Sequence, residues 1–305
     1  MNILLTGSSG FVASHLCLTL TQHGYTLSPI SRSTFGEITP NTDWSSVISG
    51  VDCVIHLAAR VHLMQDTATN PLAVYRAANT ASTLNLAQQA AAADVRRFIF
   101  LSSIKVNGEG CDTPYTEQDI PAPTDPYAIS KWEAEQGLLE IAAQTGMEVV
   151  ILRPPLIYGA GVKANFLRLM QWVERGYPLP FGSVTNQRSL LYIGNLVDAI
   201  LTCINHPAAA NQTFLVSDTK ALSTAELIRK MAYHFQRHPR LLNIPQNLLM
   251  SLLSIIGRKQ EAERLLGSLI LDNSLIKKTL DWNPPFSVQA GLKETIEAYR
   301  NHTHV

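Results

Sequence analysis

The chain has 305 residues, of which 46% are hydrophobic, and it carries 24 basic against 24 acidic side chains. This length and composition suit a main globular domain with a smaller second one. Because nucleic-acid binders generally present a basic surface, the balanced charge argues against a nucleic-acid partner. The apolar run 247–257 is about half the length needed to cross a bilayer, so we also expect no membrane insertion.

The cysteines lie far apart and form no Cys-x-x-Cys pair; they are Cys17, Cys53, Cys111 and Cys203. This spacing argues against a zinc ribbon, a redox dithiol and a disulfide framework. No secretory signal is readable at the N-terminus, so we expect a cytoplasmic protein. We expect no metal ion, because no third ligand accompanies His234 and His238.

Apolar runs of strand length alternate with longer amphipathic segments in the first half of the chain. The expected strands are 2–6, 26–31, 53–57, 98–102 and 148–152, and the expected helices are 11–23, 73–93 and 127–144. Continuous apolar strands are typical of a parallel sheet with helices on both faces, and their alternation with helices is the βαβ pattern. The sequence therefore predicts an α/β fold with a Rossmann-type doubly wound parallel sheet.

The second half is richer in Pro and Gly, which indicates a smaller lobe. Short apolar segments recur at 189–193 and 213–216, so we expect the sheet to regain strands near 186–220. The expected organisation is a Rossmann domain over 1–155 and a smaller C-terminal lobe made of 156–185 and 221–305.

A glycine-rich turn joins the first expected strand to the first helix. Gly7 allows a tight turn, and Gly10 lets backbone N–H groups approach a pyrophosphate at the positive end of the helix. Ala13 is small where the helix packs against the strand. At this junction the pattern favours dinucleotide binding over a plain tight turn, so 1–155 is predicted to bind NAD(P).

The end of the second expected strand bears on the choice between the two nicotinamide cofactors. A carboxylate there generally accepts a hydrogen bond from the ribose 2′-hydroxyl of NAD, and this chain has none. Arg32 can instead pair with a 2′-phosphate, assisted by the hydroxyls of Ser31 and Ser33. The sequence favours NADP(H); NAD(H), with Arg32 as a solvated surface residue, is the alternative.

A tyrosine and a lysine lie four residues apart at the start of the helix over 127–144. Tyr127 and Lys131 therefore share one helical face. A nearby ammonium favours the phenolate and lowers the pKa of a tyrosine from its usual value of about 10. Ser103 follows the fourth expected strand, and ligands of doubly wound sheets bind beyond the carboxyl ends of strands. Its hydroxyl is thus placed to share a substrate oxygen with Tyr127.

These motifs resemble the extended short-chain dehydrogenase/reductase family, also called the NAD-dependent epimerase/dehydratase family. The matching segments are 6–12, 56–59, Asn79 with the helix that follows it, 102–103, 127–131, 152–154, 158–159 and 188–198. The resemblance implies that Tyr127 is the acid/base. It further implies that Lys131 lowers the pKa of Tyr127 and holds the nicotinamide ribose, and that Ser103 orients a sugar oxygen.

The resemblance also implies a set of binding residues. The expected cofactor-binding residues are Gly7, Ser9, Gly10, Phe11, Val12, Arg32, Asp43, Leu57, Ala58, Ala59, Asn79, Ser102, Tyr127, Lys131 and Pro154. The expected substrate-binding residues are Ser103, Asn165, Arg188 and Arg264. Asp43 falls near the position that touches adenine in relatives, although its spacing is unusual. For Arg264 the alternative is a charge on a helix surface.

Members of this family commonly catalyse 4-epimerisation, 4,6-dehydration or ketosugar reduction. Dehydratases carry an Asp-Glu pair directly after the catalytic serine or threonine, and this chain has Ile104 and Lys105 there, which argues against dehydration. Segments 56–64 and 103–108 resemble bacterial enzymes that reduce UDP-4-keto-6-deoxy-N-acetylhexosamines for O-antigen and capsule synthesis. Together with Arg32, which points to NADPH, they make a 4-reductase in surface polysaccharide biosynthesis the main prediction.

Two alternatives stay open. The first is a UDP-sugar 4-epimerase of the UDP-glucose or UDP-N-acetylglucosamine type, with tightly bound NAD. The second, a non-catalytic dinucleotide-binding regulator, is disfavoured because Ser103, Tyr127 and Lys131 are all present. Family members often dimerise through helices equivalent to 73–93 and 127–144, so a homodimer is a further expectation.

Overall fold

The computed structural model describes residues 1–61, 69–110, 113–255 and 265–303. The strands are β1 (Asn2–Thr6), β2 (Thr26–Ile30), β3 (Cys53–His56), β4 (Arg97–Leu101), β5 (Glu148–Arg153), β6 (Leu156–Tyr158), β7 (Leu190–Tyr192) and β8 (Gln212–Leu215). The α-helices are α1 (Phe11–Gln22), α2 (Arg32–Phe35), α3 (Ser45–Ile48), α4 (Pro71–Tyr75), α5 (Ser82–Ala92), α6 (Pro126–Thr145), α7 (Ala164–Glu174), α8 (Ile193–Asn205), α9 (Thr224–His234), α10 (Gln246–Ile255), α12 (Ser274–Leu280) and α13 (Val288–Thr303). A π-helical segment, η1 (Arg76–Ala81), and two 3-10 turns, η2 (Ile104–Val106) and η3 (Pro207–Ala209), complete the elements. None of the helices described is long and apolar enough to cross a membrane.

The main sheet has six parallel strands in the order β2-β1-β3-β4-β5-β8. This order confirms the doubly wound Rossmann-type fold. The chain leaves β1 toward β2 on one side and returns to β3 on the other, so a crevice forms where the carboxyl ends of β1 and β3 diverge. Ligands of open α/β sheets bind at such a switch point.

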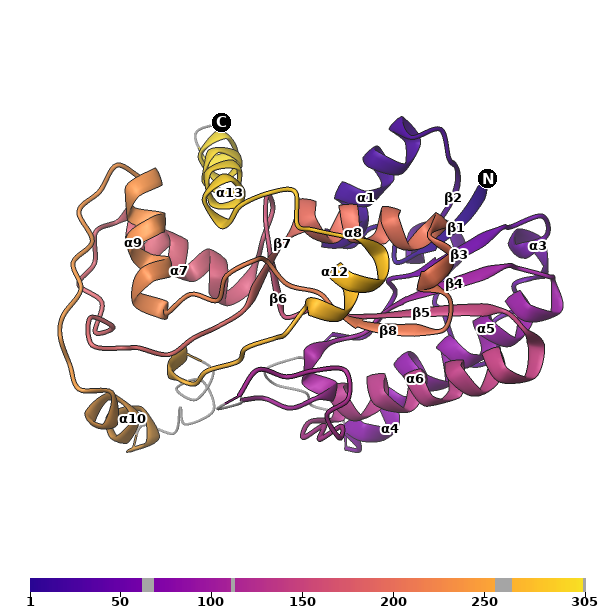
Figure 1. Ribbon diagram of the computed structural model, residues 1–305, viewed down its shortest axis with the longest axis horizontal. Helices are drawn as coiled ribbons and strands as arrows, with labels where there is room; N and C mark the ends of the chain where they lie inside the picture. The colour runs from indigo at the N-terminus through magenta and orange to yellow at the C-terminus, as the bar shows by residue number, and fades with distance from the viewer. Residues whose placement is uncertain (62–68, 111–112, 256–264, 304–305) are drawn as a thin grey trace.

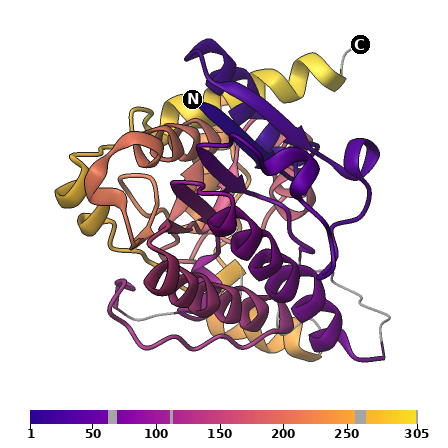
Figure 2. The ribbon, with the colours of Figure 1, turned by 90° about the vertical axis from the view of Figure 1, so that its right-hand side faces the viewer.

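Helices cover both faces of this sheet because successive strand residues point to opposite faces. Ile3 and Leu5 belong to the core beneath α1 and α8, whereas Leu4 belongs to the core beneath α5 and α6. Figure 1 shows α1 and α8 above the sheet and α5 and α6 below it. Figure 2, turned by 90°, shows the same three layers, with the indigo α1 on the opposite side of the strands from the magenta helices. The apolar, buried centres of the inner strands β1, β3, β4 and β5 follow from this double coverage.

The second lobe contains α7, α9, α10 and α13 and lies beside the sheet (Figure 1). The two strands expected near 186–220 separate: β8 joins the main sheet next to β5, whereas β7 pairs with β6 in a two-stranded sheet. The expectation that the segment 189–193 returns to the main sheet is therefore wrong. Pro154 and Pro155 follow β5 and lack the N–H groups that would continue its ladder, so the chain leaves the sheet before β6 begins.

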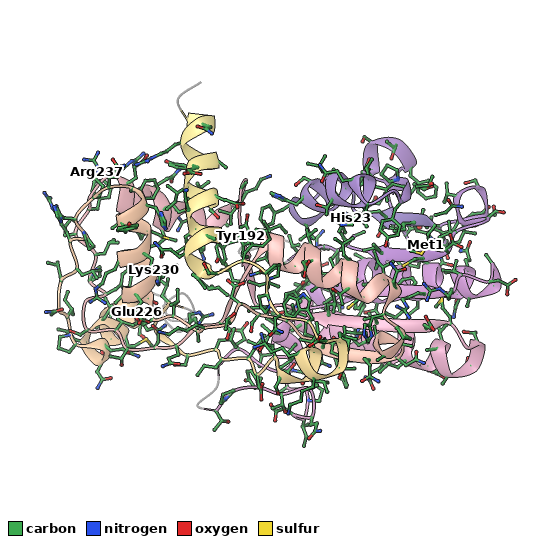
Figure 3. The ribbon with its side chains drawn as sticks, turned by 45° about the horizontal axis from the view of Figure 1, so that its top comes forward. Met1, His23, Tyr192, Glu226, Lys230 and Arg237 are labelled. Atoms are coloured by element: carbon green, nitrogen blue, oxygen red, sulfur yellow. The ribbon has the colours of Figure 1, made fainter. Side chains whose placement is uncertain are left out.

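Tyr192 lies at the junction of the two lobes. It ends β7, and its ring lies 5.6 Å from that of Tyr158 and 5.5 Å from that of Phe286. In Figure 3 its side chain lies between the region of Met1 and His23 and the distant α9. The contacts of this one ring thus join β6, β7 and the segment before α13.

The helix expected over 73–93 is interrupted. The structure has α4, then η1, then α5, and the extra residue in the π-helical turn directs Asn79 inward, where it is fully buried. π-Helical turns frequently occur at functional sites. The amphipathic pattern could not reveal this insertion because apolar residues continue on both sides of it.

Candidate active site

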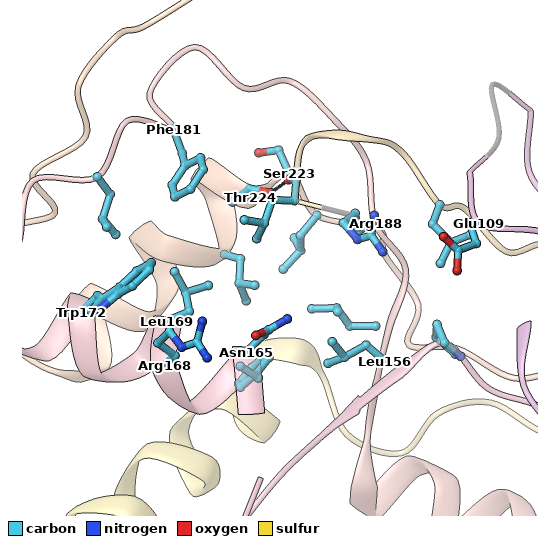
Figure 4. A pocket seen from close by; sticks show the side chains of 18 of the residues that line it. Glu109, Leu156, Asn165, Arg168, Leu169, Trp172, Phe181, Arg188, Ser223 and Thr224 are labelled. Atoms are coloured by element: carbon cyan, nitrogen blue, oxygen red, sulfur yellow. Dashed lines mark hydrogen bonds between the residues drawn. The ribbon is translucent and has the colours of Figure 1, made fainter. Parts of the chain in front are cut away.

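A cavity of about 1080 Å³ lies between the sheet and the second lobe. Ser103 and Tyr127 line it from the sheet side, and Asn165 and Arg188 line it from the second lobe. Figure 4 shows Asn165 on α7 and Arg188 on a facing segment. The structure therefore brings together four of the residues expected at the site, whereas Arg264 lies outside the described residues.

α6 positions Tyr127 at its first turn. Asp125 caps the helix by accepting a 2.7 Å hydrogen bond from the Ala128 N–H, Pro126 occupies the first helical position, and Gly146 ends the helix in a left-handed conformation. The loop after β4 brings Ser103 to the same place, and its side chain hydrogen-bonds the Tyr127 phenol. A substrate oxygen that contacts both hydroxyls would be held between the sheet and α6.

The electrostatics of Tyr127 differ from the sequence prediction. Burial raises the pKa of its phenol, the Asp125 carboxylate raises it further, and the hydrogen bond with Ser103 opposes both effects. The lowered pKa expected from Lys131 is therefore not found in this arrangement. Spacing alone could not show where the lysine amine points.

Lys131 lies one turn further along α6 and is buried. Its Nζ donates a 2.8 Å hydrogen bond to the Leu101 carbonyl and lies 4.3 Å from the centre of the Phe100 ring. Burial lowers the pKa of this amine to about 7, against the opposing effect of Glu135. The amine thus lies at the carboxyl end of β4 and changes its charge near neutral pH.

A directed chain of hydrogen bonds connects the switch-point strands to η1. The His56 ring contacts Thr6 Oγ1 through Nδ1 at 2.7 Å and Thr83 Oγ1 through Nε2 at 2.9 Å. Because the Thr83 hydroxyl donates its own proton to the Asn79 carbonyl, it accepts from His56 Nε2, so Nδ1 accepts from Thr6. Burial, with a contribution from Lys131, lowers the pKa of His56 to about 3, and the ring is therefore neutral. Sequence reasoning matched His56 to the family but gave it no role.

The glycine turn has the geometry that dinucleotide binding requires. Gly7 has φ +72°, and a Cβ there would lie 2.8 Å from the Ala58 backbone nitrogen, so only glycine fits. Gly10 caps α1 without any side-chain hydrogen bond, so the first N–H groups of the helix are not satisfied by a capping side chain. The exposed Ser9 precedes it, and Phe11 and Val12 begin the helix. This uncapped N-terminus suits a pyrophosphate.

Some residues that were expected to contact the cofactor lie in this crevice, but their polar groups form hydrogen bonds within the protein. Asn79 accepts from the Arg60 N–H at 2.7 Å, and its amide donates to the Arg60 carbonyl and to Ser130 Oγ. It therefore fixes the loop that carries Leu57, Ala58 and Ala59. Pro154 likewise accepts the Ile104 N–H at 3.0 Å. Asn79 in particular supports the crevice rather than offering a polar group to it.

Ser102, also expected at the cofactor, belongs to a buried polar network. Its hydroxyl donates to Glu135, which forms a bidentate ion pair with Arg153, and Arg153 Nη1 donates to Asn107 Oδ1 at 2.9 Å. Both members of the ion pair are almost completely buried. Because removing one partner from such a pair is costly, the network fixes β4, β5 and α6 to one another. Nothing in the spacing of these residues signals the network.

Two expected cofactor residues lie at the far edge of the sheet. Asp43 is exposed, and its carboxylate accepts a 2.9 Å hydrogen bond from the Ser45 N–H, which lowers its pKa. Arg32 is exposed at the first position of α2, directly after β2, and Ser31 caps that helix. Arg32 is therefore placed where β2 ends, as expected, while Asp43 is used to stabilise the start of α3.

The remaining wall of the cavity could not be predicted from sequence motifs. Its residues come from β6, from α7 and the segment that follows it, and from the start of α9 with the residues just before it; they include Leu156, Arg168, Leu169, Trp172, Phe181, Leu222, Ser223 and Thr224. Figure 4 shows Trp172 on α7 and Thr224 on α9 around the same space. This apolar wall could enclose a bulky ligand far larger than a water molecule.

The fold and this site together define an enzyme of the short-chain dehydrogenase/reductase class. Residues 3–217 match the model of the NAD dependent epimerase/dehydratase family. The chain is 46% identical to the UDP-glucose 4-epimerase of Vibrio cholerae over 98% of this chain and 95% of that protein. It belongs to the NAD-dependent epimerase/dehydratase family, the extended short-chain dehydrogenases/reductases.

Solved structures share the fold across nearly the whole chain. The UDP-glucuronic acid 4-epimerase from Bacillus cereus in complex with NAD matches with a TM-score of 0.80 and 21% identity, covering 99% of each chain. RMD from Pseudomonas aeruginosa, complexed with NADPH, matches with a TM-score of 0.79 and 22% identity, covering 98% of this chain and 99% of the other. At such identities the similarity concerns the fold, and the two neighbours contain different nicotinamide cofactors.

Proposed function

We propose that the protein is a UDP-sugar 4-epimerase. The observation that carries this proposal is the pairing of Ser103 with Tyr127 at the sheet end of a cavity whose other wall includes Asn165 and Arg188. The 46% identity to the Vibrio cholerae UDP-glucose 4-epimerase, over almost the full length of both chains, supports the epimerase. It favours the alternative raised by the sequence over the 4-reductase that was the main prediction.

In this proposal Tyr127 removes the proton from the C4 hydroxyl of the sugar and later returns it to the ketone oxygen. Ser103 hydrogen-bonds the same oxygen and keeps it in line with the phenol. Bound NAD supplies a hydride acceptor and then a hydride donor at C4. The ketosugar rotates in the site between the two hydride transfers, so each face of C4 is presented once to the nicotinamide. The width of the cavity permits this rotation.

The diphosphate and the sugar would be held from the second lobe. Arg188 lines the cavity and has the planar guanidinium that suits bidentate binding of phosphate. Asn165 lies on the first turn of α7 and provides both a donor and an acceptor for sugar hydroxyls. The apolar wall near Trp172 and Phe181 would take the uracil ring.

The crevice at β1 and β3 fits NAD. The uncapped start of α1 would bind the pyrophosphate, Ala58 would lie beside the dinucleotide, and Lys131 would contact the nicotinamide ribose. An epimerase regenerates its cofactor in every cycle, so it gains nothing by releasing it. We therefore expect tightly retained NAD.

A 4-reductase that uses NADPH is the second candidate, and Arg32 is the observation that favours it. Arg32 is exposed at the end of β2, where a 2′-phosphate would lie, and no carboxylate of β2 or the α2 turn competes with it. A reductase would require added NADPH and a 4-ketosugar. Arg32→Ala would then lower the affinity for NADPH about tenfold and leave that for NADH unchanged. Equal effects on the two cofactors would exclude Arg32 as the determinant.

We also propose that the protein is cytoplasmic and forms a homodimer, as expected from the sequence. α5 and α6 pack side by side on one face of the sheet and present the surface through which that dimer would form.

The proposal is tested by incubating the purified protein with UDP-glucose and no added nucleotide, and following UDP-galactose by NMR. An epimerase brings the two sugars to equilibrium, and the denatured protein releases NAD. Tyr127→Phe serves as the matched control, since it removes one hydroxyl and leaves the nucleotide crevice intact. An absence of product without NADPH, and turnover of a 4-ketosugar with it, would overturn the proposal in favour of the reductase.

A further inference from the structure

Lys105 lines the cavity beside Ser103, and the function proposed above gives it no role. It belongs to η2, the 3-10 turn that directly follows the catalytic serine. Family dehydratases carry an acidic residue at this position, whereas this chain carries a lysine.

Lys105 makes contacts on both sides of the catalytic pair. Its backbone N–H donates to the Ser103 hydroxyl at 3.3 Å. Its side-chain amine donates to Asp125, the residue that caps α6, and to Glu109 at 2.7 Å. Because Asp125 lies two residues before Tyr127, the lysine connects the loop that bears Ser103 with the helix that bears Tyr127.

The charges around the Tyr127 phenol show why this contact matters. Asp125 is the charged group whose field disfavours the phenolate, Tyr75 adds a smaller contribution of the same sign, and the hydrogen bond from Ser103 opposes them. The rings of Tyr75 and Tyr127 are 6.4 Å apart. Lys131, deeper under the sheet, is bound to the Leu101 carbonyl. The Lys105 amine is therefore a cation in direct contact with the carboxylate that disfavours the Tyr127 phenolate.

We propose that Lys105 is a positioning residue for Tyr127: it joins the Ser103 loop to the start of α6 and balances the negative charge of Asp125. The inference rests on the proposed function for its activity readout. Lys105 is only partly exposed, with 23% of its side-chain surface accessible, so water screens this pairing less than it screens surface ion pairs.

Three variants separate the charge effect from simple loss of packing. Lys105→Met removes the cation and keeps most of the side-chain length. Asp125→Asn removes the anion and still caps α6, because asparagine is a favourable capping residue. Lys105→Arg retains the positive charge. Lys293→Met is the matched control, because Lys293 is exposed and its partner Glu297 is 3.9 Å away.

The experiment measures kcat and KM from pH 5.5 to 10 for wild type and each variant. Lys105→Met is expected to shift the acidic limb of the kcat profile upward by about one pH unit, because Asp125 then disfavours the phenolate more strongly. This shift lowers kcat about tenfold at pH values below the limb and has little effect above it. The double variant Lys105→Met/Asp125→Asn should return the limb to its wild-type position or below, and Lys105→Arg should leave it there. Lys293→Met should not move it.

Two results would overturn the inference. One is a loss of kcat in Lys105→Met with no shift in the position of the limb, which would indicate a structural role. The other is a pH-independent rise in KM that Asp125→Asn does not reverse, which would make Lys105 a sugar-binding residue. Failure of the proposed function is seen separately, as a wild type that converts no UDP-sugar. In that case the melting temperatures of the two single variants and the double variant still test the pairing, because strictly additive shifts would exclude it.

Discussion

The two ends of the site are built in different ways. At the cofactor end, Gly7, Gly10 and Phe11 lie within one short segment, and the loop after β3 packs directly on Gly7. At the substrate end, the cavity wall is assembled from segments as distant as Asn165 and Thr224. A turn that binds phosphate through its backbone has a local sequence requirement, whereas a cavity lined by side chains needs only the correct tertiary arrangement. The first end can therefore be recognised in the sequence, whereas most of the wall of the second cannot.

Tyr127→Phe is the variant that separates the rate of the reaction from the binding of the nucleotide most clearly. It removes the proposed acid/base at the place where the two ends meet, and we expect kcat to fall about 10³-fold while NAD stays bound. Epimerisation assays and the nucleotide content of the purified variant measure the two effects. If the variant lost its nucleotide as well, the separation of the two ends would be wrong.

Gly7→Ala is expected to disrupt the cofactor-binding crevice and to leave the substrate cavity unchanged. The left-handed conformation costs about 1–2 kcal/mol for alanine, and the new Cβ would meet the Ala58 nitrogen at 2.8 Å. We expect loss of most bound nucleotide and a lower free energy of unfolding in urea. Gly24→Ala is the matched control, because Gly24 has φ +78° but nothing within 4 Å of its Cβ position. Equal destabilisation by the two substitutions would mean that the contact with Ala58 is unimportant.

The buried amine of Lys131, which lies between the two ends, makes the free energy of unfolding depend on pH. Burial lowers the pKa of this amine to about 7 in the folded chain, whereas an unfolded lysine has a pKa of about 10.4. Between these values the unfolded chain binds a proton that the folded chain does not, so the free energy of unfolding rises with pH. Relative to Lys131→Met, the wild type should gain up to about 1.4 kcal/mol per pH unit between pH 7 and 10. Urea unfolding at three pH values measures this slope, and parallel curves would show that the amine is not buried as described.

Arg188→Lys is expected to weaken the binding of the UDP-sugar, and its effect is the smallest of these variants. Lysine keeps the charge but loses the planar fork that binds phosphate, so KM for the UDP-sugar should rise about tenfold with kcat and nucleotide content nearly unchanged. Steady-state kinetics test this. A fall in kcat with an unchanged KM would remove Arg188 from substrate binding.

The sequence predicted the doubly wound sheet because its strands are continuous apolar runs separated by amphipathic helices. The position of Ser103 after a strand, the Tyr127 motif, the glycine-rich loop before Asn165 and the family resemblance of Arg188 also assigned these four residues to one site, and all four line the cavity. The sequence could not show the direction of a side chain within that site. The amine of Lys131 turns to the Leu101 carbonyl, and the amide of Asn79 turns inward because of a π-helical turn that leaves no periodic signal.

The buried polar pairs were also beyond the sequence. Arg153 and Glu135 are 18 positions apart and meet only because α6 packs across β5. Lys105 and Asp125 meet because η2 and the start of α6 lie at the same edge of the sheet. Such contacts depend on the packing of whole elements, so residue type and spacing carry no information about them.

The central claim is that the site transfers a hydride from C4 of a UDP-sugar and returns it to the same carbon. It is tested most directly with UDP-glucose labelled with deuterium at C4, incubated with the purified protein and no added cofactor. We expect UDP-galactose that retains the deuterium at C4. Loss of the label to solvent, or formation of product only when NADPH and a 4-ketosugar are supplied, would contradict the account.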